Sequence, residues 1–299
     1  MRAVPEKTSA FMNSVDEPNQ PSNLKSHILR SLAKLPPMPQ IILKAQETMA
    51  NPNAGLRDLA RIIENDQALV ARVLSLANSA YYGISGQVSS VQHASILLGL
   101  RTLGDLITMS ATSVLLTREL KGYHLAPQTI WRHSLSSALC ARRIAERRFP
   151  GTEADAFVVG LLHDAGKIIL DPFICQKKEN AEAGIPDQAP VTESHEMELL
   201  GVDHAEVMAL ACRFWRFPDP QVRGIRFHHH PAQSSQSKLA YVAHLGHTLS
   251  LQAGFGGTEI ETPLIEDGVL EFLNLQPADL DELHDDMIQA LANLEETLH

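Results

Sequence analysis

The chain has 299 residues, of which 44% are hydrophobic, 20% charged and 5% aromatic, which is enough for about two domains, each with a buried core. Its formal net charge of −10 has the wrong sign for a protein held to nucleic acid through phosphates, so we expect no direct nucleic-acid binding. Three scattered cysteines form no CxxC motif and the first ten residues lack the apolar core of a secretory signal, so we expect a cytoplasmic protein.

The longest apolar region, residues 96–116, is interrupted by Arg101 and Asp105. Such charges are too costly inside a membrane but ordinary in helices with one buried face, so we expect no membrane contact. One local basic run is typical of the solvated face of a helix and consists of Arg142, Arg143, Arg147 and Arg148.

In chain order, residues 1–23 are polar and Pro-containing and lack apolar periodicity, which predicts a flexible N-terminal arm. A short helix follows and is ended by "LPPMPQ" at residues 35–40, because proline lacks the amide donor that a helix needs. Helical spacing then recurs at 41–49 and 59–63. Asp66 begins another predicted helix, where the helix dipole favours an acid, and this helix ends near Asn78 and Gly83. Strict apolar–polar alternation does not persist in this half, so the sequence predicts an all-α fold.

Residues 126–254 hold most of the histidines. The first two predicted helices here are 131–149 and 153–170, and the second contains "GLLHDAGKIIL". A polar stretch with Pro and Gly follows to about Val191 and predicts a loop or short-helix excursion. Further helical stretches contain "ESHEMELLG" with "DHAEVMALACRFW", "PQVRGIRFHHH" and "KLAYVAHLGHTLSL". The acidic final part, from Thr258, closes with an amphipathic helix that begins near Pro277.

A His-Asp doublet followed by a lysine carries the chemistry of this segment. His163 and Asp164 are neighbours on a predicted helix, about 100° apart, so they can hold one ion from two sides or bridge to a second. Lys167 lies four residues after His163 and three after Asp164 and therefore edges the same face, where its ammonium can steady a phosphate or a metal-bound water. Asp164 and Lys167 are the candidate catalytic residues.

One doublet is weak evidence, but other histidines on predicted helical segments accompany it: His133, His204, His228, His229, His230, His244 and His247. Imidazoles with a carboxylate are the ligands that Zn, Mn and Fe prefer, and histidines facing inward from several helices make a metal site in a bundle core. Plainer interpretations stay open, namely His133 as a hydrogen-bonded core residue, His204 as part of a helix cap and His230 as a structural residue. Surface positions are expected for His27, His124 and His195.

Six stretches, in this order, resemble the HDOD family, the HD-related output domains of bacterial signalling: "LPPMPQ", "IENDQALVARVLSLANSAYYG", "VQHASILLGLRTLGDLI", "GLLHDAGK", "LLGVDHAEVMALACRFWRFP" and "IRFHHHP". The resemblance runs from about residue 24 to 252, and the Asn78-Ser79 segment is especially specific to the family. It implies a family-specific N-terminal helical bundle at 24–125, packed on an HD-like metal-site domain at 126–255, with a C-terminal helical extension at 256–299. Members commonly act as regulatory or output modules, and in many the metal ligands have decayed.

Similarity to the metal-binding HD proteins implies seven ligand positions in this chain: His133, His163, Asp164, His204, His228, His229 and His247. The last is a departure, because HD enzymes place an aspartate there. The Gly-Tyr-Pro element of the cyclic-di-GMP-hydrolysing relatives is also missing after His230, which puts that activity in doubt.

The departure has an electrostatic consequence. Two divalent cations bring four positive charges, and Asp164 is the one obvious anionic ligand unless Asp203 or Glu206 turns inward. We therefore expect one divalent Fe, Mn or Zn ion to be held more readily than two. Such an ion can promote attack on a phosphoester or simply tie helices together.

Two functions stay open at this point. The preferred hypothesis is a bacterial signal-transduction output or regulatory protein with a retained or partly retained HD-type metal site. In it, the bundle around Asp66, Asn78 and Ser79 binds a partner, either a signalling protein or a small phospho-ligand, although helix capping and turn formation also explain these residues. The alternative is an enzyme, a metal-dependent phosphohydrolase acting on a nucleotide or phosphodiester.

Overall fold

The structure is a computed structural model that describes residues 25, 27–28, 30, 40–51, 53–63, 66–84, 86–180, 190–256 and 264–296. Within these residues it is helical, and the only extended pairing is an isolated antiparallel bridge between Leu120 and Leu125. The predicted all-α fold is thus confirmed. The predicted arm at 1–23 and nearly all of "LPPMPQ" lie outside the described residues.

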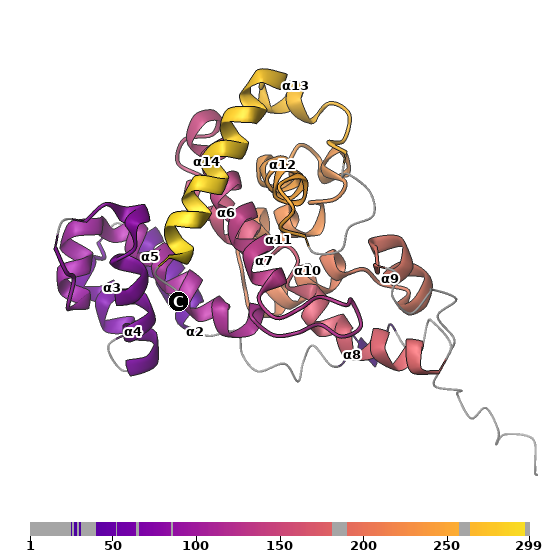
Figure 1. The fold of residues 1–299 in the computed structure, drawn as a ribbon, viewed down its shortest axis with the longest axis horizontal. Coiled ribbons are helices and arrows are strands. Elements are labelled where there is room, and N and C mark those ends of the chain that lie inside the picture. The colour runs from indigo at the N-terminus through magenta and orange to yellow at the C-terminus, as the bar shows by residue number, and fades with distance from the viewer. Residues whose placement is uncertain are drawn as a thin grey trace, which may run out of the picture.

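The N-terminal half, drawn in indigo to purple in Figure 1, is built around one long helix. Helices α2 (Gln40–Ala50), α3 (Leu56–Ile63) and α4 (Gln67–Ala77) all pack on α5 (Val91–Leu116), and the short 3-10 helix η1 (Ala80–Tyr82) follows α4. Helix α5 bends at Gly99, whose φ of 80° lies in the left-handed region that glycine tolerates. Among the described helices, α5 is long and apolar enough to cross a membrane, but most of its apolar stretch is buried inside the protein, as in a core helix.

The residues predicted to bind a partner have local structural roles. Asp66 caps α4, because its carboxylate accepts a hydrogen bond from the Leu69 amide at 2.9 Å. The Asn78 side chain pairs with the backbone of Val88, donating to its carbonyl at 2.9 Å and accepting from its amide at 2.7 Å. Ser79 is buried. Capping and turn formation account for Asp66 and Asn78, and partner binding by the three residues stays a prediction.

The rest of the chain surrounds helix α6 (Thr129–Arg148), on which α7 (Glu153–Leu162), α12 (Lys238–Gln252) and α14 (Pro277–Glu295) pack. The remaining elements are α8 (Gly166–Glu179), α9 (Glu193–Leu200), α10 (His204–Phe214), α11 (Asp219–Arg226), the 3-10 helix η2 (Pro231–Ser234) and α13 (Val269–Leu273). Figure 1 shows α14, in yellow, running beside α6 toward α5. The predicted closing helix therefore begins at Pro277, as expected.

The predicted single helix over 153–170 is wrong. Helix α7 ends at Leu162, a turn follows, and α8 continues through Pro172 to Glu179, into the stretch expected to be a loop. The side chain of His163 takes the carbonyl of Gly160 as a hydrogen-bond partner at 2.7 Å, which belongs to the local geometry of the turn. Beyond it, the buried side chains of Leu170 and Ile174 anchor α8 in the core and offset the hydrogen bond that proline removes.

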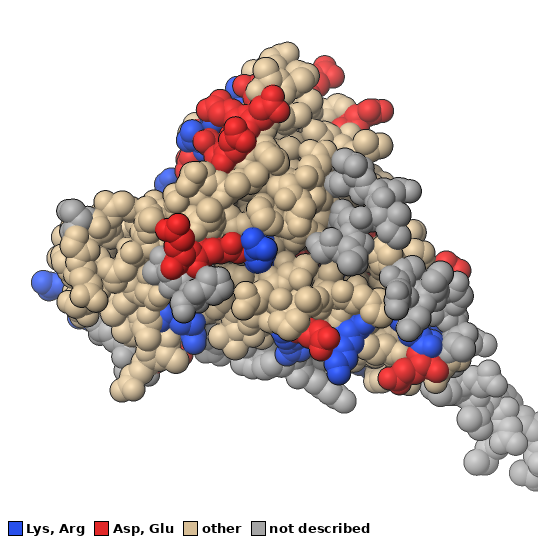
Figure 2. Space-filling model, viewed as in Figure 1, with Lys and Arg blue, Asp and Glu red and all other residues tan. Residues whose placement is uncertain are grey.

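The basic run on α6 was expected to be a solvated face, and for Arg142 this prediction is wrong. The Arg142 side chain is 12% exposed and lies 2.6 Å from Asp105 of α5 in an ion pair. Arg143 and Arg147 both reach Asp286 of α14, at 2.9 and 3.3 Å. Figure 2 shows acidic side chains, with basic ones beside them, gathered where α14 lies. The run therefore joins α6 to α5 on one side and to α14 on the other.

Candidate metal centre

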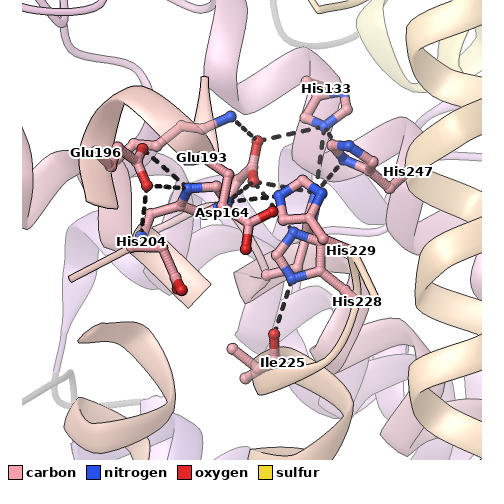
Figure 3. Close-up of polar contacts among 12 residues, drawn as sticks. His133, Asp164, Glu193, Glu196, His204, Ile225, His228, His229 and His247 are labelled. Atoms are coloured by element: carbon pink, nitrogen blue, oxygen red, sulfur yellow. Dashed lines mark hydrogen bonds and ion pairs between the residues drawn. The ribbon is translucent and has the colours of Figure 1, made fainter. Parts of the chain in front are cut away.

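The seven predicted ligands converge on one centre, which divides into two sets of donor atoms (Figure 3). In the first set, the His163 Nε2 atom lies 3.2 Å from His133 Nε2 and 2.9 Å from His247 Nδ1, and the latter two are 3.0 Å apart. Asp164 completes this set, with Oδ2 at 3.4 Å from His133 Nε2. These four residues come from α6, the turn after α7, and α12, and all are buried.

The second set also contains Asp164. Its Oδ1 atom lies 3.1 Å from His204 Nε2 and 3.7 Å from His228 Nε2, and His229 Nε2 lies 3.0 Å from His204 Nε2. His204 is the first residue of α10, whereas His228 and His229 lie in the turn after α11. The prediction that all these histidines sit on helices is therefore wrong for the turn residues, although every one of them reaches the centre. Figure 3 shows Asp164 between His204 on one side and His133 with His247 on the other.

The spacing of the donor atoms fits a transition metal. An ion about 2.1 Å from each nitrogen places neighbouring donors about 3.0 Å apart in octahedral geometry and about 3.4 Å apart in tetrahedral geometry. The distances quoted for the first set, between 2.9 and 3.4 Å, lie in this range. The donor set is imidazole with one carboxylate, which suits Zn, Fe or Mn.

Contacts behind the donors orient two of the rings. The carbonyl oxygens of Gly160 and Ile225 can only accept, so Nδ1 of His163 and of His228 donates to them, at 2.7 and 2.8 Å. In the neutral rings this leaves Nε2 as a bare lone pair directed at the centre. The Nε2 atom of His228 is buried and has no hydrogen-bond partner among the described residues. Such an orphaned lone pair is the condition that a bound cation relieves.

Glu196 of α9 is the site residue that sequence reasoning missed. Its carboxylate accepts from His204 Nδ1 at 2.8 Å and from the His204 amide at 2.7 Å, and the Tyr123 hydroxyl donates to it at 2.7 Å. A carboxylate behind a metal-binding histidine fixes the ring and strengthens its donor nitrogen. The available signal was position, because Glu196 lies three and four residues before Leu199 and Leu200, on the buried face of α9.

Small residues let the supporting helices approach closely enough to bring the histidines together. A Cβ atom at Gly160 of α7 would lie 2.6 Å from the Cα atom of Ala138 on α6. A Cβ atom at Gly246 of α12, next to His247, would lie 2.7 Å from the Ser137 carbonyl on the same helix α6. A larger residue at either glycine would push apart the helices that carry the first set.

Charge in the centre is unevenly shared. Burial by itself raises the pKa of Asp164, but Lys167, at 2.7 Å from its Oδ2, acts with His163 and His204 to hold that pKa well below its ordinary value. Burial lowers the pKa of His204, but Glu196 and Asp164 outweigh it and raise the pKa to about 9. Without a metal, His204 is therefore cationic at neutral pH and lies between the carboxylates of Glu196 and Asp164, so an ion must displace its Nε2 proton.

Four of the other histidines are neutral. Burial lowers the pKa of His133 to about 4, and it lowers the pKa values of His163, His229 and His247 well below the ordinary value. Neutral imidazole is the form that binds metal. Four uncharged rings packed around one carboxylate are costly to bury without a ligand, which favours a bound cation.

Several expected residues stay out of the two sets. Asp203 caps α10 and pairs with Arg226, and Glu206 pairs with Lys25, so neither turns inward to add a second carboxylate to the centre. His230 is exposed and lies 3.3 Å from Glu193. His244 is buried behind the centre, its Nδ1 donating to the carbonyl of His228 at 2.8 Å. The surface prediction holds for His27 and His124, while His195 is half-buried.

The fold and the centre together define an all-helical protein with a candidate metal site built from histidine and aspartate. A family model, the HDOD domain, matches residues 35–231, which is more than half of the chain, so the chain belongs to the HDOD family.

Relatives agree with this assignment. An HDOD domain protein with unknown function from Geobacter sulfurreducens is 23% identical, with a TM-score of 0.71 and coverage of 92% of this chain and 99% of that one. A candidate phosphohydrolase from Shewanella amazonensis SB2B is 24% identical, with a TM-score of 0.68 and coverage of 91% and 98%. At such identities the two structures support the fold alone. An uncharacterized protein from Treponema pallidum (strain Nichols) is 27% identical over 276 residues, and the alignment spans 88% of this chain but half of that relative.

Proposed function

We propose that this HDOD protein is a metal-dependent phosphohydrolase acting on a phosphoester such as a nucleotide or phosphodiester. The observation that carries the proposal is the position of Asp164, which belongs to both donor sets. A carboxylate shared by two adjacent ion positions is the arrangement of two-metal phosphoryl-transfer sites. A centre that had lost this function would not need a donor at every one of the seven positions.

The residues around the centre have distinct roles in this proposal. When bound, a divalent ion supplies Lewis acidity toward a phosphoryl oxygen. Lys167 holds Asp164 at 2.7 Å, and its side chain is 18% exposed, so a phosphate that arrives from solvent can reach its ammonium. Glu196 holds the His204 ring in place through Nδ1. His229 is half-buried while the other six ligands are buried, which puts the open side of the centre at Lys167 and His229.

We infer that one ion is held tightly and a second weakly. Asp164 is the only carboxylate in the two sets, and Glu196 adds a second negative charge one contact away. The positive charge of the Lys167 ammonium offsets part of the negative charge of these two carboxylates. Two divalent ions would leave the buried centre with excess positive charge, which a low-dielectric site tolerates poorly.

A second candidate function is a signalling output module without catalysis, in which the ion only joins helices. Burial of the donors favours it, because an ion held between α6, the turn after α7, α10, the turn after α11 and α12 would tie these elements together. Under this proposal the surface that signals lies elsewhere, for example around Asp66, Asn78 and Ser79 of the N-terminal half.

One experiment separates the two candidates. The protein is purified without chelator or nickel affinity, loaded with Fe, Mn or Zn, and assayed with bis(p-nitrophenyl) phosphate. The hydrolase proposal expects a metal-dependent rate that Asp164→Asn abolishes, that Lys167→Ala lowers while metal stays bound, and that His230→Ala leaves unchanged. A metal-loaded wild type with no rate above buffer on this substrate or on a nucleotide panel rejects hydrolysis and leaves the output module.

A further inference from the structure

A cavity lies on the other side of the elements that carry the second donor set. It is partly open to solvent and is bounded by α10, α11 and η2, and its volume is about 520 Å³. Arg213 of α10 lines it, together with Arg223 and Arg226 of α11. Figure 1 shows α10 and α11 side by side in the middle of the molecule.

The cavity is positive although the protein is acidic. Three guanidinium groups line it and only one carboxylate does, that of Glu206, for a net charge of +2 within a chain of net charge −10. Glu206 is already engaged, with Lys25 at 2.9 Å and Arg226 at 3.7 Å. Arg213 makes no ion pair among the described residues. Guanidinium groups gathered in a partly enclosed space favour an anion between them.

Arg223 and Arg226 form ion pairs that orient them but do not occupy all of their N–H donors. Arg226 is held by Asp203 at 3.2 Å, and Arg223 by Asp219 at 3.3 Å. Even when Asp203, Asp219 and Lys25 are counted with the lining residues, the net charge stays at +1. A guanidinium has five N–H donors, so each arginine keeps donors for a ligand.

The remaining wall is apolar. Leu210 and the ring of Phe227 line the cavity beside the arginines and are half-buried. A volume of this size is typical of sites for small organic ligands. A ligand that satisfies both walls has an anionic group for the arginines and a flat apolar part for the ring of Phe227.

We propose that this cavity binds a small phosphorylated molecule that carries a ring, such as a nucleoside monophosphate. Phosphate matches the planar donor pattern of arginine, and the ring covers Phe227 and Leu210. A large polyanion such as nucleic acid fits less well, because the acidic remainder of the protein repels it. The site is distinct from the metal centre and does not depend on the proposed hydrolysis.

Its position gives the ligand a contact with the turn of the second donor set. Arg226 and Phe227 directly precede His228, and Glu206 lies on α10 two residues after His204. The test must therefore separate binding in the cavity from binding at the metal centre, which could also attract phosphate.

Binding is measured by calorimetry on full-length protein treated with chelator, with AMP, inorganic phosphate and adenosine as probes. We expect AMP to bind more tightly than either phosphate or adenosine. Arg213→Gln and Arg223→Gln should each weaken AMP binding by about tenfold or more, because each removes one charged donor. The matched control is Arg216→Gln, an exposed arginine near α10 that does not line the cavity. It should bind AMP like the wild type, and so should Asp164→Asn.

Three results would overturn the proposal. These are no binding of AMP or phosphate at millimolar concentration, equal binding by the wild type and both cavity variants, and loss of binding in Asp164→Asn. Arg223→Lys guards against a folding artefact, since it keeps the charge and should retain part of the affinity. Failure of the hydrolase assay leaves this test unaffected, because the cavity is measured without metal.

Discussion

His247 presents its Nδ1 atom to the centre, and Nδ1 is separated from the backbone by the same number of bonds as a carboxylate oxygen of aspartate. A histidine can therefore stand where HD enzymes place an aspartate, without displacing α12. The exchange costs the site one negative charge. At the scale of single residues, this explains how the centre keeps a donor atom at position 247, although the residue there is a histidine and not an aspartate.

The same geometry makes His247→Asp a defined test. An aspartate at this position reaches the place of Nδ1 and adds a negative charge, so a second divalent ion should bind more tightly. The metal-to-protein ratio at saturating metal should rise above that of the wild type, while His247→Ala should lower it. An equal ratio in wild type and His247→Asp would contradict the charge argument for one tight ion.

Because Asp164 belongs to both donor sets, its loss should affect metal binding more than the loss of one histidine. His163→Ala removes a donor from one set, whereas Asp164→Asn removes the anionic donor from both, so the second change should cost more bound metal than the first. Metal content by mass spectrometry after dialysis checks this order. His230→Ala is the control, because its side chain is 54% exposed and belongs to neither set. Unchanged metal in Asp164→Asn would exclude the assignment.

At the scale of elements, the contact between α9 and α10 shows where sequence reasoning reached its limit. The ligand positions could be predicted, because each lies in a recognisable motif and the motifs occur in the order the family requires. The pairing of Glu196 with Tyr123 could not, because the hydrogen bond between them joins residues 73 apart and exists only once the chain has folded. The break between α7 and α8 was also missed, and there the contact between the His163 side chain and the Gly160 carbonyl is local.

The Tyr123 hydroxyl provides a test of how Glu196 of α9 holds His204 of α10. Tyr123→Phe keeps the ring and removes only the hydroxyl that donates to Glu196 at 2.7 Å. Glu196 then holds His204 less firmly, so metal affinity should fall, and Glu196→Gln should weaken it further, by roughly 10- to 100-fold. Affinity is measured by competition with a chromogenic chelator. Tyr241→Phe is the control and should behave like the wild type, because Tyr241 of α12 stacks its ring on Phe272 of α13 and makes no hydrogen bond to Glu196 within the described residues.

At the scale of the whole molecule, the buried histidines set how stability of the metal-free protein depends on pH. His133 and His244 have pKa values of about 4 when folded and about 6.5 when unfolded, so their contribution is present above pH 6.5 and is lost as the pH falls through 4. His204 has a folded pKa of about 9, so its contribution is present below pH 6.5 and is lost as the pH rises through 9. Burial raises the pKa of Asp105 to about 6, so this residue stabilises the folded protein at acid pH and acts against the two histidines, but it is a single group.

We therefore expect the melting temperature of chelator-treated protein to be highest near pH 6.5 and to fall on both sides. Each shift of His133 or His244 corresponds to about 3 kcal/mol at full effect. Thermal denaturation between pH 4 and 9 measures the curve, and His204→Gln should flatten the alkaline limb only. A melting temperature that keeps rising from pH 6.5 to 4 would show that the histidines are not buried in the neutral form.

We propose that seven side chains from five separate parts of the fold form a working metal centre. The direct measurement is the metal-to-protein ratio of full-length protein purified without chelator or nickel affinity, by inductively coupled plasma mass spectrometry. We predict about one tightly bound Fe, Mn or Zn ion per chain, lost in Asp164→Asn and kept in His230→Ala. Wild-type protein that retains no transition metal, even after incubation with each ion and dialysis, would contradict the account.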